Sequence, residues 1–400
     1  RIVKDMHVDT QLEAALRALD HWPRFRLRLF FEGIVVGILS GTVISFFRWG
    51  LEMGTVWRQW IYANVLASGG VLLNLSWFGV LLAAALLLWR LGIYELNAGG
   101  SGIPQVKGVI LGAIRMRWLR ILWVKLVGGI VGIGLGLSLG REGPSIQIGA
   151  VTAQGLSRAL GRTRMEERYL ITAGASAGLA AAFNAPLAGV MFALEELHRN
   201  FSGVVLAPSM AAALLATMVS RYVFGRAPVF HFGMLPPFPL RYMWLVVILG
   251  IIIGLAGVVF NKGLLNIHYF YDLPVFRNNY MRIAFALCMA GILGYVFPEV
   301  LGGGNDLVNS LYTLPLSLKL FAGLLIGKFL FTLVSYGCGV PGGFFLPMLV
   351  LGALTGGITG IVFVHLGLIS SYYLSNIVVI SMAAFFAASV QSPVTGTILI

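Results

Sequence analysis

The chain has 400 residues, of which 58% are hydrophobic and 11% charged, and 51 of them are glycine. Together with a mean hydropathy of +0.89, this composition excludes a soluble globular domain and indicates a polytopic helical membrane protein. The net charge of +13 arises from basic residues in short clusters between apolar runs. Such clusters are typical of cytoplasmic loops under the positive-inside rule, so we expect a multi-pass plasma (inner) membrane protein and no nucleic-acid partner. The clusters are Arg24/Arg26/Arg28, Arg115/Arg117/Arg120 and Arg158/Arg162/Arg164.

Apolar segments follow one another along the chain, and glycine-rich breaks interrupt several of them. Irregular backbone at membrane depth is stable only where protein buries it or where it lines an aqueous cavity, so these breaks predict a lined pathway rather than a simple bundle. After a mixed polar and apolar segment at 1–29, which predicts a cytoplasmic, interfacial amphipathic helix, the predicted segments are Leu29–Trp49, Gly69–Trp89, Arg120–Leu139, Ser145–Leu160, Ile171–Phe183, Leu187–Leu194, Phe201–Ser220, Tyr242–Phe260, Ile283–Phe297, Leu320–Tyr336, Phe344–Leu366 and Ile377–Val390.

The sequence contains an internal repeat. An offset of 203 residues pairs Lys125 with Lys328, Gly140 with Gly343, Glu142 with Phe345, Pro144 with Pro347, and Gly99-Gly100 with Gly302-Gly303. An offset of 213 pairs glycines of the first long span with Gly250, Gly254 and Gly263, and an offset of 207 pairs Pro186 with Pro393. Two related halves with broken helices in corresponding places predict a transporter or channel whose site lies at the repeat interface near mid-membrane.

The repeat also predicts the organisation of the chain. We expect an N-terminal helix over 1–29, a first membrane repeat over 30–224, a linker over 225–240 and a second membrane repeat over 241–400. Apolar sequence in the first half continues well past Gly189, whereas the second half has only four residues after Gly396. The C-terminal helix of the second repeat is therefore expected to be missing from this sequence.

One break places an ionisable residue at membrane depth. Gly140-Arg141-Glu142-Gly143-Pro144 follows the apolar run from Leu126 to Leu139. Proline is favoured in a first helical turn, so a helix is predicted from Ser145 onward, with free N–H groups that attract anions. A charge at this depth costs about 2.5–3.5 kcal/mol on insertion scales, so Glu142 is a functional candidate by default. An ion pair with Arg141 is the structural alternative, which we discount because adjacent helical residues point apart.

Two further breaks, Gly100–Pro104 and Gly343–Pro347, have the same glycine-plus-proline composition. Three helix N-termini that point at one another would surround an anion with backbone donors, and the Ser101 hydroxyl would add another. Lys125 and Lys328 either raise the potential at this centre or extend to an interface or a carboxylate. The histidines have no metal-ligand spacing, and neither a metal nor another cofactor is expected.

The three breaks are similar to the selectivity-filter segments of the CLC family of chloride channels and chloride/proton exchangers. The residues that carry this resemblance are Gly100, Ser101, Gly102, Ile103 and Pro104; Gly140, Arg141, Glu142, Gly143 and Pro144; and Gly343, Phe344, Phe345, Leu346 and Pro347, supported by Ala182–Gly189. The resemblance implies an all-α inverted repeat of tilted and broken helices around a mid-membrane anion site. It also implies a homodimer in which each subunit has its own pathway.

The resemblance implies roles for individual residues. Ser101, Phe344 and Phe345 match the chloride ligands, and the serine is typical of chloride-selective members. Glu142 matches the gating glutamate that also carries the external proton, and Glu196 matches the internal proton acceptor of exchangers. Glu196 has a plainer alternative, because Glu195-Glu196 also reads as a solvated helix end near Arg199. The family's tyrosine ligand, near the end of the membrane domain, has no counterpart in this sequence.

The sequence thus predicts a secondary active transporter, not an enzyme, that exchanges chloride for protons, with a passive chloride channel of the same fold as the alternative. A different class would be an intramembrane hydrolase using Ser176 within Gly174–Gly178. That pattern resembles a nucleophile elbow, but it lacks the preceding strand and histidine partner that such a site needs.

Overall fold

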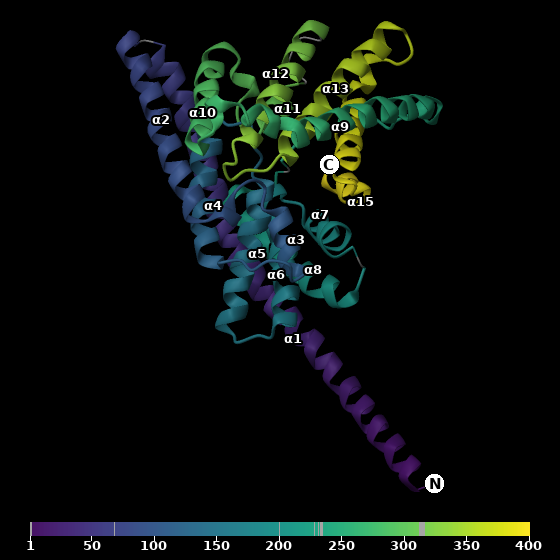
Figure 1. Ribbon diagram of the computed structural model, residues 1–400. Coiled ribbons are helices and arrows are strands. Elements are labelled where there is room, and N and C mark those ends of the chain that lie inside the picture. Colours follow the sequence, from purple (N-terminus) through teal and green to yellow (C-terminus); the bar gives the residue numbers. More distant parts are fainter. Residues whose placement is uncertain are drawn as a thin grey trace.

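The computed structural model describes residues 2–67, 69–199, 201–227, 229–230, 232, 235–311 and 317–400, without the side chains of residues 2–24. It is a helical protein (Figure 1). The α-helices are α1 Ile2–Trp60, α2 Val71–Tyr94, α3 Ile103–Ile110, α4 Trp118–Gly134, α5 Glu142–Ala159, α6 Arg164–Phe183, α7 Pro186–Phe192, α8 Gly203–Phe224, α9 Met243–Tyr271, α10 Asn279–Val296, α11 Asn305–Ser310, α12 Leu318–Gly337, α13 Phe345–His365, α14 Leu374–Val390 and α15 Pro393–Leu399. Short π-helical turns extend α1 (η1, Ile61–Leu66) and α7 (η3, Ala193–His198), and 3₁₀ turns lie at Leu96–Ala98 (η2), Leu240–Tyr242 (η4), Pro274–Phe276 (η5), Pro298–Val300 (η6) and Ser371–Tyr373 (η7).

Eight helices of the described chain are long and apolar enough to cross a membrane. Of the remaining long helices, α5 and α6 lie in the interior, where α6 is buried along nearly its whole length, whereas α4 exposes Leu119 and Trp123 near its start. Close packing explains their many small residues: a Cβ placed on Gly149 of α5 would overlap the Gly174 carbonyl of α6. Small residues allow helix backbones to approach in this way inside a membrane.

The two halves occupy different parts of the molecule. Helices α9 to α13 lie together in the upper part of Figure 1, and α3 to α8 lie below them, with α15 in between and next to α7. Helix α2 runs alongside both parts and packs against α10. Helices α4 to α7 recur as α12 to α15 in the same order, and α8 follows the first set only within the described chain. The predicted fold class is confirmed.

Backbone conformation repeats between the halves as well. Asn184, which ends α6, has φ +61°, and Gln391, which ends α14, has φ +62°. These two residues are 207 positions apart, which agrees with the offset that pairs Pro186 with Pro393. At the first break, however, the positive-φ glycines pair Gly100 with Gly302 and Gly102 with Gly304. The predicted pairing of Gly100 with Gly303 is therefore wrong by one residue.

Several predicted helix ends also differ from the structure; for example, α6 begins at Arg164 rather than at Ile171, and α4 ends at Gly134 rather than at Leu139. Helix α1 continues beyond Trp49 to Trp60, since Glu52 pairs with Arg48 at 3.0 Å and Gly54 packs against α4. Helix α9 continues beyond Phe260 to Tyr271, where the Asn261 amide donates to the Ser389 carbonyl at 3.1 Å. The expected division at residue 29 falls within continuous helix α1; its interfacial position remains a prediction, because the side chains of residues 1–24 lie outside the described part.

Candidate functional site

The three glycine-rich breaks meet in the interior of the protein. Gly140 and Gly343 exchange two backbone hydrogen bonds, of 2.6 Å from the Gly140 N–H and 2.8 Å from the Gly343 N–H. The N–H of Gly342 donates to the Gly100 carbonyl at 3.0 Å, which joins the third break to the first. A Cβ on Gly143 would lie 2.8 Å from the Ser101 carbonyl, so the second break packs directly against the first. The predicted convergence of the three segments is confirmed.

Each break leads into a helix whose N-cap residue, Gly102, Arg141 or Phe344, makes no side-chain cap hydrogen bond. Helix α3 starts at Ile103 with Pro104 in its first turn, α5 starts at Glu142, and α13 starts at Phe345. Uncapped first-turn N–H groups and the positive end of the helix dipole attract anions. The predicted start of α5 at Ser145 is wrong by three residues, because Arg141 already has helical dihedral angles. Glu142 is therefore part of the first turn rather than a residue in front of it.

Glu142 is buried, with 1% of its surface exposed, and its carboxylate lies beside Gly140 and the backbone N–H of Leu346. A side chain on Gly140 would overlap one carboxylate oxygen, so the glycine leaves room for the glutamate. Neither oxygen has a hydrogen-bond partner of normal geometry within the described part of the chain. Arg141 instead approaches Glu52 at 3.8 Å. The structural alternative, an ion pair between Glu142 and Arg141, is not present.

Ser101 lies in the same junction, next to Gly143, and has 3% of its surface exposed. Its hydroxyl oxygen accepts from the Ile103 N–H at 3.4 Å, and the Tyr336 phenol lies nearby. The Tyr336 ring meets the Phe344 ring edge-on, with centroids 5.3 Å apart. Phe344 and Phe345, whose centroids lie 5.5 Å apart, complete an aromatic wall next to the first turn of α13. Sequence reasoning missed Tyr336, since a tyrosine within an apolar span gives no signal of its neighbours.

The two repeat-related lysines hold the glycine-rich breaks in place. Both are fully buried. The ammonium of Lys125 donates to the Gly100 carbonyl at 2.5 Å, and that of Lys328 donates to the carbonyls of Gly302 and Val300 at 2.7 and 2.9 Å. Neither lysine reaches an interface or a carboxylate within the described chain. Because Gly100 and Gly302 are equivalent, the same hydrogen bond from a buried lysine to a glycine carbonyl occurs in both halves.

Glu195 and Glu196 do not form a solvated helix end. Glu195 accepts from the backbone N–H groups of Val394 and Thr395 at 3.2 and 2.8 Å, so it caps α15. Glu196 pairs with Lys107 of α3 at 3.1 Å and accepts from the Ser392 hydroxyl at 3.3 Å. Glu196 is thus connected to the filter through α3, whose first turn follows Ser101. The partnership with Lys107 was not predicted, because no sequence pattern relates residues so far apart.

A cavity of about 780 Å³ lies next to the second and third breaks, at Arg141 and Leu346. Its lining includes Leu346 and the glycines of the 302–304 loop. Arg48, Arg58 and Arg141 also line it, with Glu52, Glu299 and Asp306. The three arginines are matched by three carboxylates, so the lining carries no net formal charge. Arg141 and Leu346, which belong to two of the filter segments, thus border a cavity lined by charges of both signs.

Ser176 does not form a nucleophilic site in the described chain. It is fully buried within α6, and its hydroxyl donates to the Ser209 carbonyl at 3.3 Å. No strand precedes it, since the chain before it is already helical from Arg164. The described residues contain no group of three His, Cys, Asp or Glu side chains arranged for a metal ion.

Comparisons with known proteins agree with this architecture. The family model described as "Voltage gated chloride channel" matches residues 79–400. The chain is 32% identical to the H(+)/Cl(-) exchange transporter ClcA of Vibrio vulnificus (strain YJ016), over 100% of this chain and 87% of the relative. It is 34% identical to the transporter of the same name from Salmonella agona (strain SL483), over 96% of this chain and 83% of the relative.

Solved structures show the same fold. A slow cyanobacterial Cl⁻/H⁺ antiporter aligns with a TM-score of 0.87 at 30% identity, over 93% of this chain and 88% of the other. A CLC-type fluoride/proton antiporter aligns with a TM-score of 0.75 at 23% identity, over 92% of this chain and 89% of the other, which supports the fold alone. With its three converging filter segments and these relatives, the chain belongs to the CLC family of chloride channels and chloride/proton exchangers.

Proposed function

We propose that this protein is a secondary active transporter that exchanges chloride for protons across the membrane. The observation that carries the proposal is the position of Glu142, whose buried carboxylate lies among the first turns of α5 and α13 without a normal hydrogen-bond partner. This is the place that a chloride ion bound by the same N–H groups would occupy.

The exchange follows from competition at this place. A deprotonated Glu142 carboxylate is attracted by the helix dipoles and excludes chloride. Once protonated, the side chain loses that attraction, moves away and admits chloride next to Ser101, Phe344 and Phe345. Glu142 is then both the gate and the carrier of the external proton, so the two fluxes are linked through one side chain. The cavity lined by Arg141 is the proposed route by which both ions reach Glu142.

Proton transfer toward the other side needs a second acceptor, and we assign it to Glu196. Its contacts with Lys107 and Ser392 keep it partly shielded, at 16% side-chain exposure, near the cytoplasmic end expected from the arginine clusters. Glu195 is the less suitable choice, because its carboxylate is used to cap α15. Relatives named as exchangers support coupled transport over a passive channel.

We further propose that the protein resides in the plasma membrane and acts as a homodimer. The filter is assembled from residues of one chain, so each subunit would have its own pathway. Chloride and protons are the proposed transported ions, and the Ser101 hydroxyl supports chloride through a direct hydrogen bond.

Reconstitution into liposomes tests the exchange. With an inward chloride gradient as the only driving force, we expect protons to move out of the liposomes against their own gradient. Chloride flux with no accompanying proton movement would replace the exchanger with a passive channel of the same fold.

A further inference from the structure

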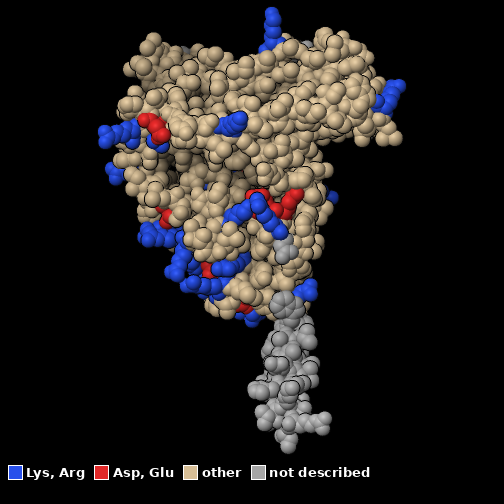
Figure 2. Space-filling model, turned by 45° about the vertical axis from the view of Figure 1, so that its right-hand side comes forward, with Lys and Arg blue, Asp and Glu red and all other residues tan. Residues whose placement is uncertain are grey.

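The arginines between α3 and α4 and at the end of α5 gather on one part of the surface. Lys and Arg side chains gather at the lower end of the coloured surface in Figure 2, whereas the upper end shows few charges. By the positive-inside rule, the crowded end is the cytoplasmic side. Nothing in the proposed exchange uses these arginines, so their arrangement needs a separate explanation.

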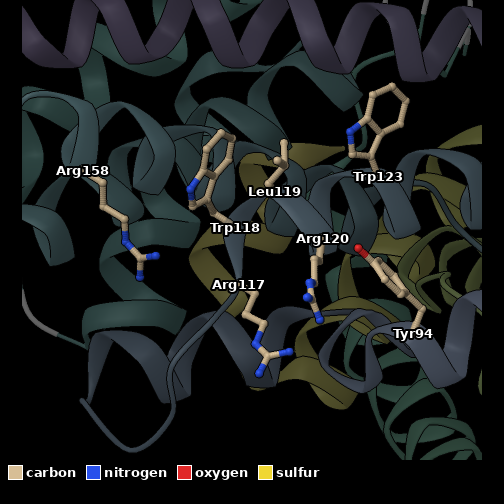
Figure 3. A pocket seen from close by; sticks show the side chains of 7 residues that line it. All are labelled: Tyr94, Arg117, Trp118, Leu119, Arg120, Trp123 and Arg158. Atoms are coloured by element: carbon tan, nitrogen blue, oxygen red, sulfur yellow. The ribbon is translucent and has the colours of Figure 1, made fainter.

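Three of them line one cavity of about 550 Å³, together with aromatic and apolar side chains (Figure 3). Arg117 precedes α4, Arg120 belongs to its first turn, and Arg158 lies near the end of α5. Tyr94 is the last residue of α2. The lining contains no Asp or Glu, so its formal charge is positive.

The charge of the cavity is only partly compensated. Arg158 approaches Glu167 at 3.5 Å. Arg120 lies over the Tyr94 ring, with its guanidinium carbon 5.0 Å from the centroid. Among the described residues, no carboxylate pairs with Arg117 or Arg120. Their guanidinium groups point in the same direction, away from the Trp123 indole (Figure 3). This leaves two guanidinium groups available for a ligand with several acceptor oxygens.

The other side of the cavity is apolar and faces outward. Trp123 and Leu119 are 60% and 49% exposed, and Tyr94 is 55% exposed. Exposed tryptophan and tyrosine at the end of apolar helices are typical of the membrane–water interface. Trp118, in contrast, packs against Gly155 of α5 and fixes the start of α4. The cavity therefore has a cationic wall and an apolar wall at the level of the lipid headgroups.

We propose that this cavity binds the phosphate headgroup of an acidic glycerophospholipid from the cytoplasmic leaflet. Guanidinium groups bind phosphate oxygens through paired hydrogen bonds, which assigns the phosphate to Arg117 and Arg120. The acyl chains run along Leu119 and Trp123 toward the hydrocarbon. A free phosphate ion would use the arginines but would gain nothing from the exposed apolar wall, so the mixed lining favours a lipid.

Native mass spectrometry of the purified protein tests the site. The probes are phosphatidylglycerol, phosphatidylcholine and inorganic phosphate, added separately to the intact protein in detergent. The test variant is Arg117→Gln/Arg120→Gln, and the matched control is Arg26→Gln/Arg164→Gln, which removes the same charge from exposed arginines outside the cavity. Size-exclusion profiles and chloride transport establish that each variant is folded.

We expect retained phosphatidylglycerol adducts on the wild-type protein and on the control, and few with phosphatidylcholine. The test variant should bind phosphatidylglycerol about 25-fold more weakly, from a loss of about five-fold per arginine near an anionic lipid. Trp123→Ala should weaken lipid binding while leaving inorganic phosphate unaffected. Equal retention by the test and control variants would overturn the site, and displacement of the lipid by inorganic phosphate would assign the cavity to a free anion instead.

Discussion

Gly140 and Gly343 occupy equivalent positions in the two halves and bind each other through two reciprocal hydrogen bonds. Self-complementary contact of this kind arises where two copies of one element meet across a two-fold axis. The local axis therefore passes between these two glycines. Glu142 and Phe345, which follow them at the same distance, mark the point where the halves differ in chemistry.

Replacing Gly143 by alanine should disrupt the junction without changing its charge. The new Cβ would lie 2.8 Å from the Ser101 carbonyl and 2.9 Å from its Cβ, and overpacking of this kind costs about 1–3 kcal/mol. We expect a lower Tm in detergent and loss of most chloride flux. The control is Gly79→Ala, where the exposed glycine of α2 has no neighbour within 4 Å; equal effects of both changes would contradict the packing argument.

Glu142→Gln should separate chloride flux from pH. The glutamine has nearly the same shape but neither carries a negative charge nor exchanges a proton, so it cannot alternate between excluding and admitting chloride. We expect chloride flux in liposomes that no longer varies with pH and proton movement at background level. Retained coupling in this variant would remove Glu142 from the gate.

Glu196→Gln should abolish proton movement while sparing chloride flux, because Glu196 contacts α3 and α15 rather than the anion site itself. Parallel records from chloride and pH electrodes give both fluxes from the same liposomes. Glu195→Gln is the neighbouring control, since it should lower stability by about 0.5–1.5 kcal/mol through loss of one of the two acceptor oxygens that cap α15, and leave coupling intact. Proton pumping that survives Glu196→Gln would require another internal acceptor.

Tyr336→Phe should weaken chloride binding selectively. The change removes the phenol hydroxyl next to Ser101 but keeps the ring that packs on Phe344. One hydrogen bond contributes about 0.5–1.5 kcal/mol, so we expect an affinity roughly 2- to 12-fold lower by isothermal titration calorimetry. The double variant with Ser101→Ala checks the assignment: strictly additive losses would show that the two hydroxyls act independently.

The buried lysines should differ in their effect on stability. Lys328→Met leaves two carbonyls without their donor and Lys125→Met leaves one, and each such group costs about 1–3 kcal/mol. Thermal unfolding in detergent should therefore give a lower Tm for Lys328→Met. An equal or reversed order would show that neighbouring groups replace the lost donors.

The breaks and their convergence could be predicted from the sequence because glycine and proline impose local constraints wherever they occur. Repeat offsets then related the breaks to each other without any knowledge of the fold. The end of α9 could not be predicted, because Asn261 is a polar residue whose partner is the Ser389 carbonyl, a tertiary neighbour.

The same limit applies within the site. Glu142 stands out in the sequence because a carboxylate at membrane depth is costly. Tyr336 and Lys107 do not stand out, because their roles depend on neighbours from distant segments of the chain, Ser101 for Tyr336 and Glu196 for Lys107. The pairing of Gly100 was wrong by one residue because a single offset of 203 was applied to both breaks. The segment between the first and second breaks differs in length by one residue between the two halves.

The contacts between the halves restrict how the protein can move during a transport cycle. Two sets of hydrogen bonds join the halves: one between Gly140 and Gly343 at the centre, and one between Glu195 and the first turn of α15. Rocking one half against the other would break the two backbone hydrogen bonds between Gly140 and Gly343. Rotation of the Glu142 side chain breaks no backbone hydrogen bond between the halves. We therefore expect a nearly stationary scaffold during turnover, with the moving part reduced to a few side-chain torsions.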